Sequence, residues 1–255
     1  MKTKAPPSGF RQILESISQR HETRKVFDAF VRFAACALAA QTREVEYLEE
    51  VKHWERQDLD LFGKALGSLV LEMEGRPFED VLGGYYLEFA LSHKGQQWGG
   101  EFHTPKPICD LMAQMTLGDV ESLPKDRTIT VCEPACGAGA MILSLGEACP
   151  PEVRRRLRIT AIDVSRTACD MTFVNTTLWG IPTRVIHGNS LSLEMWAAWS
   201  NIHWLLPWLS LVPLHPIAAM CPPGPRADIG QGEPPTAAEV EGIKNSLHQG
   251  EFSFK

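Results

Sequence analysis

The N-terminal part of the chain, residues 10–74, carries apolar side chains at helical spacing. Recurrence every three or four positions puts the apolar residues on one face of a helix, and the first set is Phe27, Phe30, Val31, Ala34 and Leu38. A second set repeats the pattern with Leu59, Phe62, Leu66, Leu69, Leu71 and Met73. The mixed charges of residues 43–50 between them are typical of a solvent-exposed helix face. The pattern predicts a helical N-terminal region.

Glycine and proline then divide the chain into shorter segments. Gly75 and Pro77 end the preceding helix, because glycine suits the position after a helix and proline suits the start of the next one. Residues 78–91 have the pattern of a further helix, and residues 95–107 are rich in glycine and proline, which indicates a loop. Another helix is predicted over residues 105–116.

From residue 128 the pattern changes to strands alternating with helices. Residues 128–132, 158–163 and 183–187 are short, apolar and rich in β-branched side chains, as buried strands are. Helices are predicted between them over residues 141–148 and 165–178, the second capped by Ser165. Strand–helix–strand alternation predicts right-handed crossovers and a parallel sheet, and therefore an α/β fold.

The pattern weakens toward the C-terminus. Residues 202–206 are predicted as a fourth strand, residues 207–235 are rich in proline and glycine and predicted to be irregular, and residues 239–247 have the pattern of a short helix. We therefore expect a helical region over residues 1–94, a sheet-containing domain over 95–206 and a proline- and glycine-rich tail over 207–255. Four tryptophans near the second boundary could stack bases, but they are predicted to cover a sheet edge or to contact a partner: Trp196, Trp199, Trp204 and Trp208.

Composition excludes some classes of protein. The 255 residues have a formal net charge of −6, which counts against autonomous DNA binding but leaves room for a local basic groove. Seven scattered cysteines, with no signal peptide, indicate reduced thiols in a cytoplasmic protein. Cys132 and Cys136 are four residues apart, but no second pair follows at zinc spacing, so we expect no metal site. No apolar run approaches the length of a membrane span.

A glycine loop follows the first predicted strand. It reads Glu133, Pro134, Ala135, Cys136, Gly137, Ala138 and Gly139. Glycines at the carboxyl end of a buried strand let a ligand approach the backbone closely, and open α/β sheets bind ligands at that edge. The alternative is a tight strand-to-helix turn without a ligand.

Polar side chains also end the next two predicted strands. Asp163 follows the second strand, where a carboxylate can accept both hydroxyls of a ribose, although it could instead cap a helix. Asn189 follows the third strand, where its amide could bond an adenine edge, although Gly-Asn is also an ordinary turn. Three consecutive strand ends with suitable groups predict a nucleoside-containing cofactor.

Several segments resemble the modification subunits of type I restriction systems, which are N6-adenine DNA methyltransferases. The resemblance is carried by residues 100–105 (Gly-Glu-Phe-His-Thr-Pro), by the loop 133–139 and by residues 161–163 (Ala-Ile-Asp). Further matches are Ala168, Asn175, residues 178–180 (Leu-Trp-Gly) and residues 188–191 (Gly-Asn-Ser-Leu). The similarity covers about residues 78–191.

The resemblance implies a Rossmann-like methyltransferase fold with a shortened parallel sheet, preceded by a helical region, and S-adenosylmethionine as cofactor. Thr104 would help to hold the methionine end, and Glu133 would lie beside its amino group. The backbone of residues 134–139 would wrap the cofactor. Asp163 would take the ribose hydroxyls, and Asn189 the adenine amine.

The resemblance does not extend to the catalytic motif. The family uses Asn or Asp, two prolines and an aromatic residue to accept the hydrogens of the target amine and to stack on the flipped base. Here the corresponding segment is Cys221, Pro222, Pro223 and Gly224. Cysteine lacks the acceptor geometry of asparagine and glycine has no stacking face, so no catalytic residue is assigned.

Two main hypotheses follow. The first is a cofactor-binding relative that serves adenine-specific DNA methylation, with a partner subunit completing the site. The second is a catalytically inactive cofactor- or protein-binding relative that acts as a regulator or decoy of a restriction–modification system. A methyltransferase for a small molecule or a protein is a third alternative, because the cofactor loop does not identify the acceptor.

Overall fold

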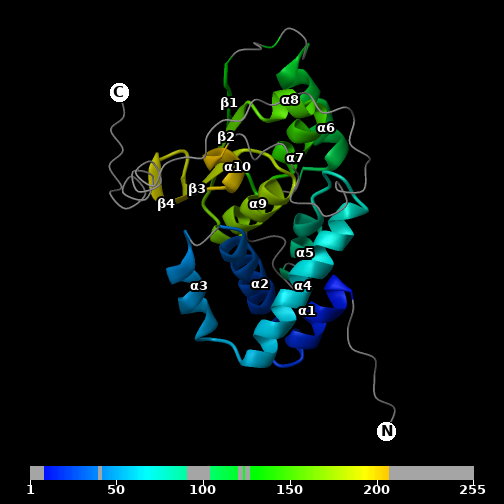
Figure 1. Ribbon diagram of the computed structural model, residues 1–255, viewed down its shortest axis with the longest axis vertical. Helices are drawn as coiled ribbons and strands as arrows, with labels where there is room; N and C mark the ends of the chain where they lie inside the picture. The colour runs from blue at the N-terminus through cyan, green and yellow to red at the C-terminus, as the bar shows by residue number, and fades with distance from the viewer. Residues whose placement is uncertain (1–8, 40–41, 91–103, 120–122, 124–126, 207–255) are drawn as a thin grey trace, which may run out of the picture. The chain divides into compact units, whose positions relative to one another are not determined.

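A computed structural model of the chain describes residues 9–39, 42–90, 104–119, 123 and 127–206 (Figure 1). The predicted N-terminal helices are confirmed. Their amphipathic faces bury Phe10, Phe27, Phe30 and Leu69 among others. The helices are α1 (Phe10–Ser18), α2 (Thr23–Leu38), α3 (Glu44–Val51), α4 (Arg56–Glu74) and α5 (Val81–Ala90).

The alternating strands and helices are also confirmed. The elements are α6 (Lys106–Leu117), β1 (Ile129–Glu133), α7 (Ala140–Ala148), α8 (Pro151–Arg154), β2 (Leu157–Asp163), α9 (Arg166–Leu178), β3 (Thr183–Asn189), β4 (Glu194–Ser200) and α10 (Ile202–Leu205). The predicted cap is present, since the Ser165 hydroxyl accepts the Ala168 N–H at 3.3 Å. No helix in the described ranges has both the length and the apolar character needed to cross a membrane.

The sheet has the order β1-β2-β3-β4. Strands β1, β2 and β3 are parallel, with Glu133 in register with Ala161 and Asp163 in register with His187. Because the strands are parallel and in this register, their carboxyl ends meet at one edge of the sheet. The described residues thus form the predicted α/β fold, with a four-stranded, mostly parallel sheet.

The prediction of a fourth strand over residues 202–206 is wrong. Residues Ile202–Leu205 form α10, whose first turn is capped by the Asn201 side chain, which accepts the Trp204 N–H at 3.0 Å. The fourth strand lies earlier, at Glu194–Ser200, and runs antiparallel to β3. The chain reverses directly after Asn189, and a side chain on Gly188 would collide with the Glu194 carbonyl oxygen. The sequence analysis allowed a turn at Gly-Asn but predicted no strand over residues 194–200, so it missed the hairpin.

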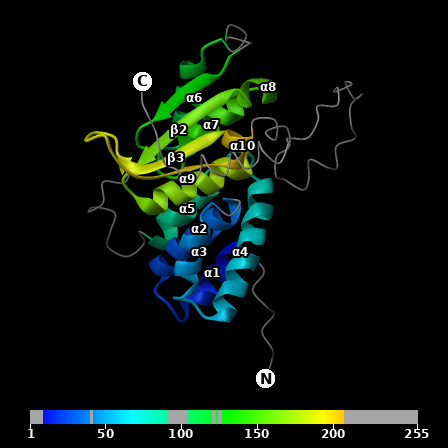
Figure 2. The same cartoon turned by 60° about the vertical axis from the view of Figure 1, so that its left-hand side comes forward.

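Helix α9 joins the helical region to the sheet. Helix α2 packs on one side of α9, and strands β2 and β3 lie on the other (Figures 1 and 2). Apolar residues of both regions belong to one continuous core. The division at residue 94/95 stays a prediction, but the described residues on its two sides share this core.

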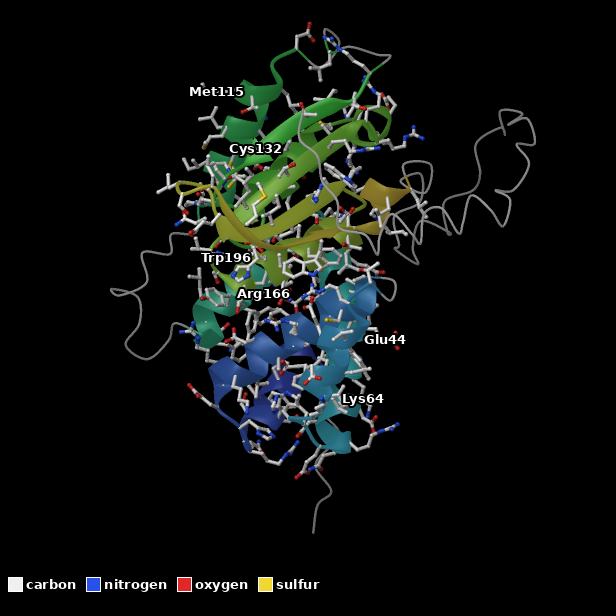
Figure 3. All side chains as sticks on the ribbon, turned by 90° about the vertical axis from the view of Figure 1, so that its left-hand side faces the viewer. Glu44, Lys64, Met115, Cys132, Arg166 and Trp196 are labelled. Carbon is white, nitrogen blue, oxygen red and sulfur yellow. The ribbon has the colours of Figure 1, made fainter. Side chains whose placement is uncertain are left out.

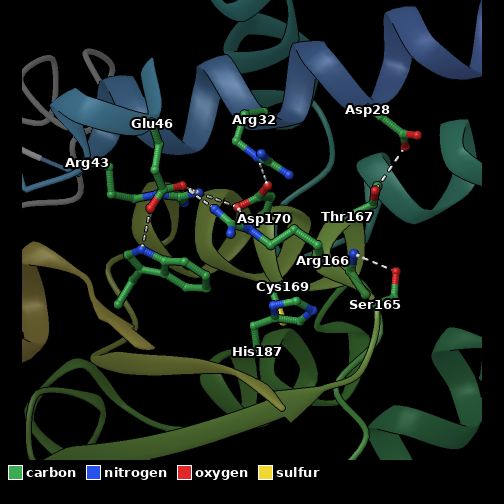
Figure 4. Close-up of polar contacts among 12 residues, drawn as sticks. Asp28, Arg32, Arg43, Glu46, Ser165, Arg166, Thr167, Cys169, Asp170 and His187 are labelled. Carbon is green, nitrogen blue, oxygen red and sulfur yellow. Dashed lines mark hydrogen bonds and ion pairs between the residues drawn. The ribbon is translucent and has the colours of Figure 1, made fainter. Parts of the chain in front are cut away.

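An ionic cluster lies between the helical region and α9, and we call it the Asp170 cluster: Arg32, Arg43, Glu46, Arg166, Asp170 and Trp199. Asp170 and Arg43 are both fully buried and 2.7 Å apart, and Arg32 Nε donates to the other carboxylate oxygen of Asp170 at 2.6 Å. Figure 4 shows these side chains pointing toward one another from α2, from the start of α3 and from α9.

Glu46 and Trp199 complete the cluster. Glu46 accepts hydrogen bonds from Arg43, Arg166 and the Trp199 indole, the last at 3.0 Å. The Arg43 and Arg166 guanidinium carbons lie 4.5 and 4.0 Å from the centre of the Trp199 ring. The interpretation of residues 43–50 as a solvated helix face is therefore wrong for Arg43 and Glu46. The local charge pattern could not show that Asp170, 127 residues away, draws Arg43 inward.

We predict that Asp170→Ala destabilises the protein by about 3–5 kcal/mol, because it leaves the buried Arg43 charge without its partner. Urea unfolding followed by circular dichroism measures the change. Lys52→Ala is the control, since it removes an exposed ion pair with Glu49, and it should leave the unfolding midpoint unchanged. Equal unfolding midpoints for Asp170→Ala and the wild type would contradict a structural role for the cluster.

Candidate functional site

The loop between β1 and α7 turns sharply at two glycines. Gly137 has φ 54° and Gly139 has φ 92°, both in the left-handed region where other residues are strained. Gly139 directly precedes α7, and a side chain there would also meet the Thr172 hydroxyl at 3.1 Å. The sequence therefore needs glycine at both positions for this turn.

Side chains of α9 and β2 form hydrogen bonds with the backbone of the loop. The Gly137 N–H donates to Asp163 Oδ2, the Thr172 hydroxyl donates to the Gly137 carbonyl, and Asn175 Nδ2 donates to the Ala138 carbonyl, each at 2.8 Å. The Cys136 N–H adds a bond to the Ile162 carbonyl at 2.9 Å. Because these bonds involve buried or half-buried groups, they fix the shape of the loop.

The same network reaches the helical region through Asp80. Asn175 Nδ2 also donates to Asp80 Oδ1 at 3.0 Å, and that oxygen accepts the Gly83 N–H at 2.8 Å in the first turn of α5. The sequence analysis did not identify Asp80 or Thr172. It named Asn175 only as one of the residues that match the type I modification subunits. An aspartate directly before an apolar helix is a cap signal that could have identified Asp80.

Asp163 lies at the carboxyl end of β2, as predicted. Its two oxygens accept the N–H groups of Gly137 and Ser165, both at 2.8 Å. Each carboxylate oxygen can accept more than one hydrogen bond, so both keep capacity for a ribose hydroxyl. The structure thus gives Asp163 a role in shaping the loop, and its role as a cofactor ligand stays a prediction.

Asn189 lies at the end of β3 and stabilises the turn into β4. Its side-chain oxygen accepts the N–H groups of Leu191 and Ser192 at 2.9 and 3.2 Å. Because an amide oxygen has two lone pairs, the group left for a ligand is the NH₂, which suits a ring nitrogen better than an adenine amine. The predicted contact with adenine stays a prediction.

Exposed apolar side chains surround the strand ends. Val164, Leu191 and Leu193 are 59%, 95% and 78% exposed, and Trp196 is 54% exposed beside His187 (Figure 3). Trp199 instead packs in the Asp170 cluster. The Arg158 guanidinium carbon lies 5.8 Å from the centre of the Trp204 ring. Trp208 lies outside the described residues. These three tryptophans therefore have different surroundings, and among them only Trp196 offers an open face near the site.

Thr104 lies near the start of α7, the helix that follows the loop. It lines an open pocket of about 350 Å³ together with Ala140 and Ser144 of α7 and with the start of α5. Glu133, Asp163 and Asn189 do not line this pocket. Residues 100–103, which precede Thr104 in the predicted motif, lie outside the described residues.

Glu133 and Cys136 have distinct environments in the loop. Glu133 is half-buried, and burial, assisted by the Asp163 charge, raises its pKa although its carboxylate accepts the Ala135 N–H at 3.3 Å. Pro134 and Ala135 are exposed. Burial raises the pKa of the Cys136 thiol to about 12, so this thiol stays protonated at neutral pH. Within the part of the chain that the structure describes, no three His, Cys, Asp or Glu side chains gather to hold a metal ion.

The structure therefore brings most of the predicted residues to one edge of the sheet. Glu133 and the loop follow β1, Asp163 ends β2, and Asn189 ends β3. The edge combines backbone N–H groups, two carboxylates and apolar surface. This combination suits a ligand with a charged end, hydroxyl groups and a flat ring.

Comparisons with known proteins identify the family of the chain. The family described as N-6 DNA Methylase matches residues 78–206, just over half of the chain. No curated protein matches the chain. A similar solved structure is that of the type I restriction-modification system methyltransferase subunit from Streptococcus thermophilus, with 18% identity and a TM-score of 0.38.

The alignment with that structure covers 72% of this chain and 44% of the subunit, so this chain spans less than half of the subunit's length. The family match includes α5, the loop after β1, Asp163 and Asn189. The chain therefore belongs to the N-6 DNA Methylase family.

Proposed function

We propose that the chain binds S-adenosylmethionine at the carboxyl edge of β1, β2 and β3, and that it serves N6-adenine methylation of DNA. The observation that carries the proposal is the glycine loop at residues 134–139 at the carboxyl end of β1, whose shape buried side chains of α9 fix by hydrogen bonds to the Gly137 and Ala138 carbonyls. Membership of the N-6 DNA Methylase family supports the reaction class.

Each part of the cofactor finds a chemically suited group. Glu133 offers a carboxylate for the amino group, and Asp163 offers acceptor capacity for the ribose hydroxyls. Val164 and Leu191 offer apolar surface for the adenine ring. Thr104, which lines a pocket with Ala140 and Ser144 of α7, is proposed to contact the methionine end. The cofactor would supply an activated methyl group, and these residues would bind and orient it.

Access to DNA is proposed to depend on a partner subunit. The chain has a formal net charge of −6, and phosphate contacts normally require basic excess. A partner that contributes basic surface and base recognition would supply these phosphate contacts.

A second candidate function is a catalytically silent cofactor binder that regulates a restriction–modification complex. The specific observation is that the four Pro-Pro pairs of the sequence follow Ala5, Cys149, Cys221 and Glu233. None follows Asn or Asp, the residues with which the family accepts the target amine's hydrogens. The Cys221 segment lies outside the described residues.

We predict that S-adenosylmethionine binds the wild-type protein with micromolar affinity and that Asp163→Ala abolishes the binding, because the ribose acceptor and the Gly137 anchor are both lost. Isothermal titration calorimetry measures the affinity. Asp60→Ala is the control, since it removes an exposed carboxylate on α4 and should bind as the wild type does. Absence of binding by folded wild-type protein would disprove the cofactor proposal.

Glu133→Gln should stabilise the cofactor-free protein at pH 7. Because burial raises the folded-state pKa of Glu133, the deprotonated carboxyl costs stability above that pKa, and the cost disappears below the unfolded-state value. The variant should therefore unfold at a higher urea concentration than the wild type at pH 7, and the difference should shrink at pH 4.

The same variant should bind S-adenosylmethionine roughly tenfold or more weakly, since a charged hydrogen bond to the amino group is lost. Urea unfolding at the two pH values and calorimetry at pH 7 measure the two effects. An affinity for S-adenosylmethionine equal to that of the wild type would show that Glu133 does not contact the cofactor. A variant less stable than the wild type at pH 7 would contradict the stability cost of burying the Glu133 carboxylate.

Expression in a host without adenine methylation, followed by sequencing for N6-methyladenine, separates the two candidate functions. New methylation that disappears in Asp163→Ala is expected for an active methyltransferase. Binding of the cofactor without methylation, with or without a partner subunit, would favour the silent regulator.

A further inference from the structure

The buried amide of Asn175 connects the N-terminal helical region to the loop after β1. Asn175 belongs to α9 and is fully buried. Its Nδ2 group donates one hydrogen bond to the Ala138 carbonyl at 2.8 Å and another to Asp80 Oδ1 at 3.0 Å. Because an amide nitrogen carries two hydrogens, these two bonds use its whole donor capacity. Asp80 lies 95 residues before Asn175 in the sequence, so one amide group links two distant segments.

The two acceptors fix the orientation of this amide. With the Asn175 side chain turned over, its oxygen would face the Ala138 carbonyl and the Asp80 carboxylate with no hydrogen between them. In the observed orientation the amide oxygen is buried and has no hydrogen-bond partner among the described residues, which costs folding free energy. Such an oxygen favours rotation of the amide toward a donor. The two acceptors on the nitrogen oppose that rotation more strongly than the Ala138 carbonyl alone.

Gly83 makes room for the Asp80 carboxylate at the start of α5. Helix α5 lies against α9 (Figures 1 and 2), and Asp80 Oδ1 accepts the Gly83 N–H at 2.8 Å. A side chain on Gly83 would come within 2.0 Å of Asp80 Oδ2. Glycine inside a helix is less favourable than alanine. The sequence thus gives up helix stability at Gly83, and the carboxylate can bond to both α5 and Asn175.

We propose that Asp80 is a positioning residue of the cofactor site. Acting through Asn175, it holds the Ala138 carbonyl, and with it the turn of the loop, in the shape that binds S-adenosylmethionine. The inference rests on the proposed binding of the cofactor at this loop. It makes the affinity for the cofactor depend on the helical region, because Asp80 belongs to that region and the loop does not.

The loop keeps other contacts when Asp80 is changed. The Thr172 hydroxyl still donates to the Gly137 carbonyl, and Asp163 still accepts the Gly137 N–H, both at 2.8 Å in the wild type. Loss of the Asp80 contact therefore weakens cofactor binding without abolishing it. Because a hydrogen bond to a carboxylate is lost, we expect an affinity roughly tenfold lower.

Calorimetric titration of the full chain with S-adenosylmethionine tests the proposal. Asp80→Ser keeps a residue that caps helices well, but its hydroxyl lies one bond closer to the backbone and away from the Asn175 amide. It should bind the cofactor roughly tenfold more weakly than the wild type, with a urea unfolding midpoint close to the wild-type value. Asp80→Asn restores an acceptor oxygen at the original distance from the backbone and should recover most of the affinity.

Two further variants separate the position of the carboxylate from the stability of α5. Gly83→Ala displaces the Asp80 carboxylate, so it should bind the cofactor more weakly although alanine favours the helix. Tyr85→Phe is the control on the same helix, since it removes a hydrogen bond from Tyr85 to Glu72 at 2.9 Å and leaves the Asp80 contact in place. Its affinity should equal that of the wild type.

A double-mutant cycle identifies the route of the effect. Asn175→Ala removes the amide, so Asp80→Ser/Asn175→Ala should bind the cofactor no more weakly than Asn175→Ala alone. Amide exchange without the cofactor gives a second readout at Gly139, whose N–H donates to the Cys136 carbonyl at 2.8 Å. This amide should exchange faster in Asp80→Ser than in the wild type, and at the wild-type rate in Tyr85→Phe. Circular dichroism checks folding, and Asp80→Ser decides the test if Asn175→Ala does not fold.

Several outcomes overturn the proposal. Wild-type affinity in Asp80→Ser removes Asp80 from the site and leaves the cofactor proposal standing. Unchanged exchange at Gly139 in that variant means that Asp80 does not hold the loop, and equal losses of affinity in Asp80→Ser and Tyr85→Phe assign the effect to the stability of α5. Additive losses in the double variant mean that Asp80 acts by a route other than Asn175, such as direct contact with a ligand in the pocket that it lines with Thr104. A folded wild-type protein that does not bind S-adenosylmethionine overturns the cofactor proposal and this one together.

Discussion

Helix α9 is buried on every side, and its polar side chains must therefore find partners inside the protein. All residues from Ala168 to Leu178 are buried, and a buried polar group without a hydrogen bond costs folding free energy. Asp170 meets Arg43 and Arg32 from the helical region. On the same helix, Thr172 and Asn175 meet the carbonyls of Gly137 and Ala138. One helix thus ties the helical region to the sheet and shapes the loop after β1.

This arrangement makes the helical region part of the candidate site. Asp80 caps α5 and also bonds to Asn175, so the N-terminal helices contact the residue that fixes the loop. The Asp170 cluster holds the same helix from its other side. A change that weakens the packing of α2 on α9 would therefore alter the loop without touching it.

Local sequence patterns predicted the elements that local chemistry decides. The β-branched run before Glu133 indicated β1, the two glycines indicated the turn, and Ser165 indicated a helix start. The patterns failed where a distant partner decides the outcome. Arg43 is buried because Asp170 lies across the interface, and residues 202–205 are helical because Asn201 bonds to Thr183 at the start of β3. The second roles of Asp163 and Asn189, as acceptors for backbone N–H groups, also required the three-dimensional structure.

The central claim is that side chains of α9 and β2 hold the loop after β1 in a shape ready for S-adenosylmethionine. Amide hydrogen exchange of the wild-type protein, with and without S-adenosylmethionine, tests this claim most directly. The account predicts slow exchange at Cys136, Gly137 and Gly139 without the cofactor, because their N–H groups are already bonded, and further protection of the loop when the cofactor is added. Fast exchange at these amides in the free protein, with no change on adding S-adenosylmethionine, would contradict it.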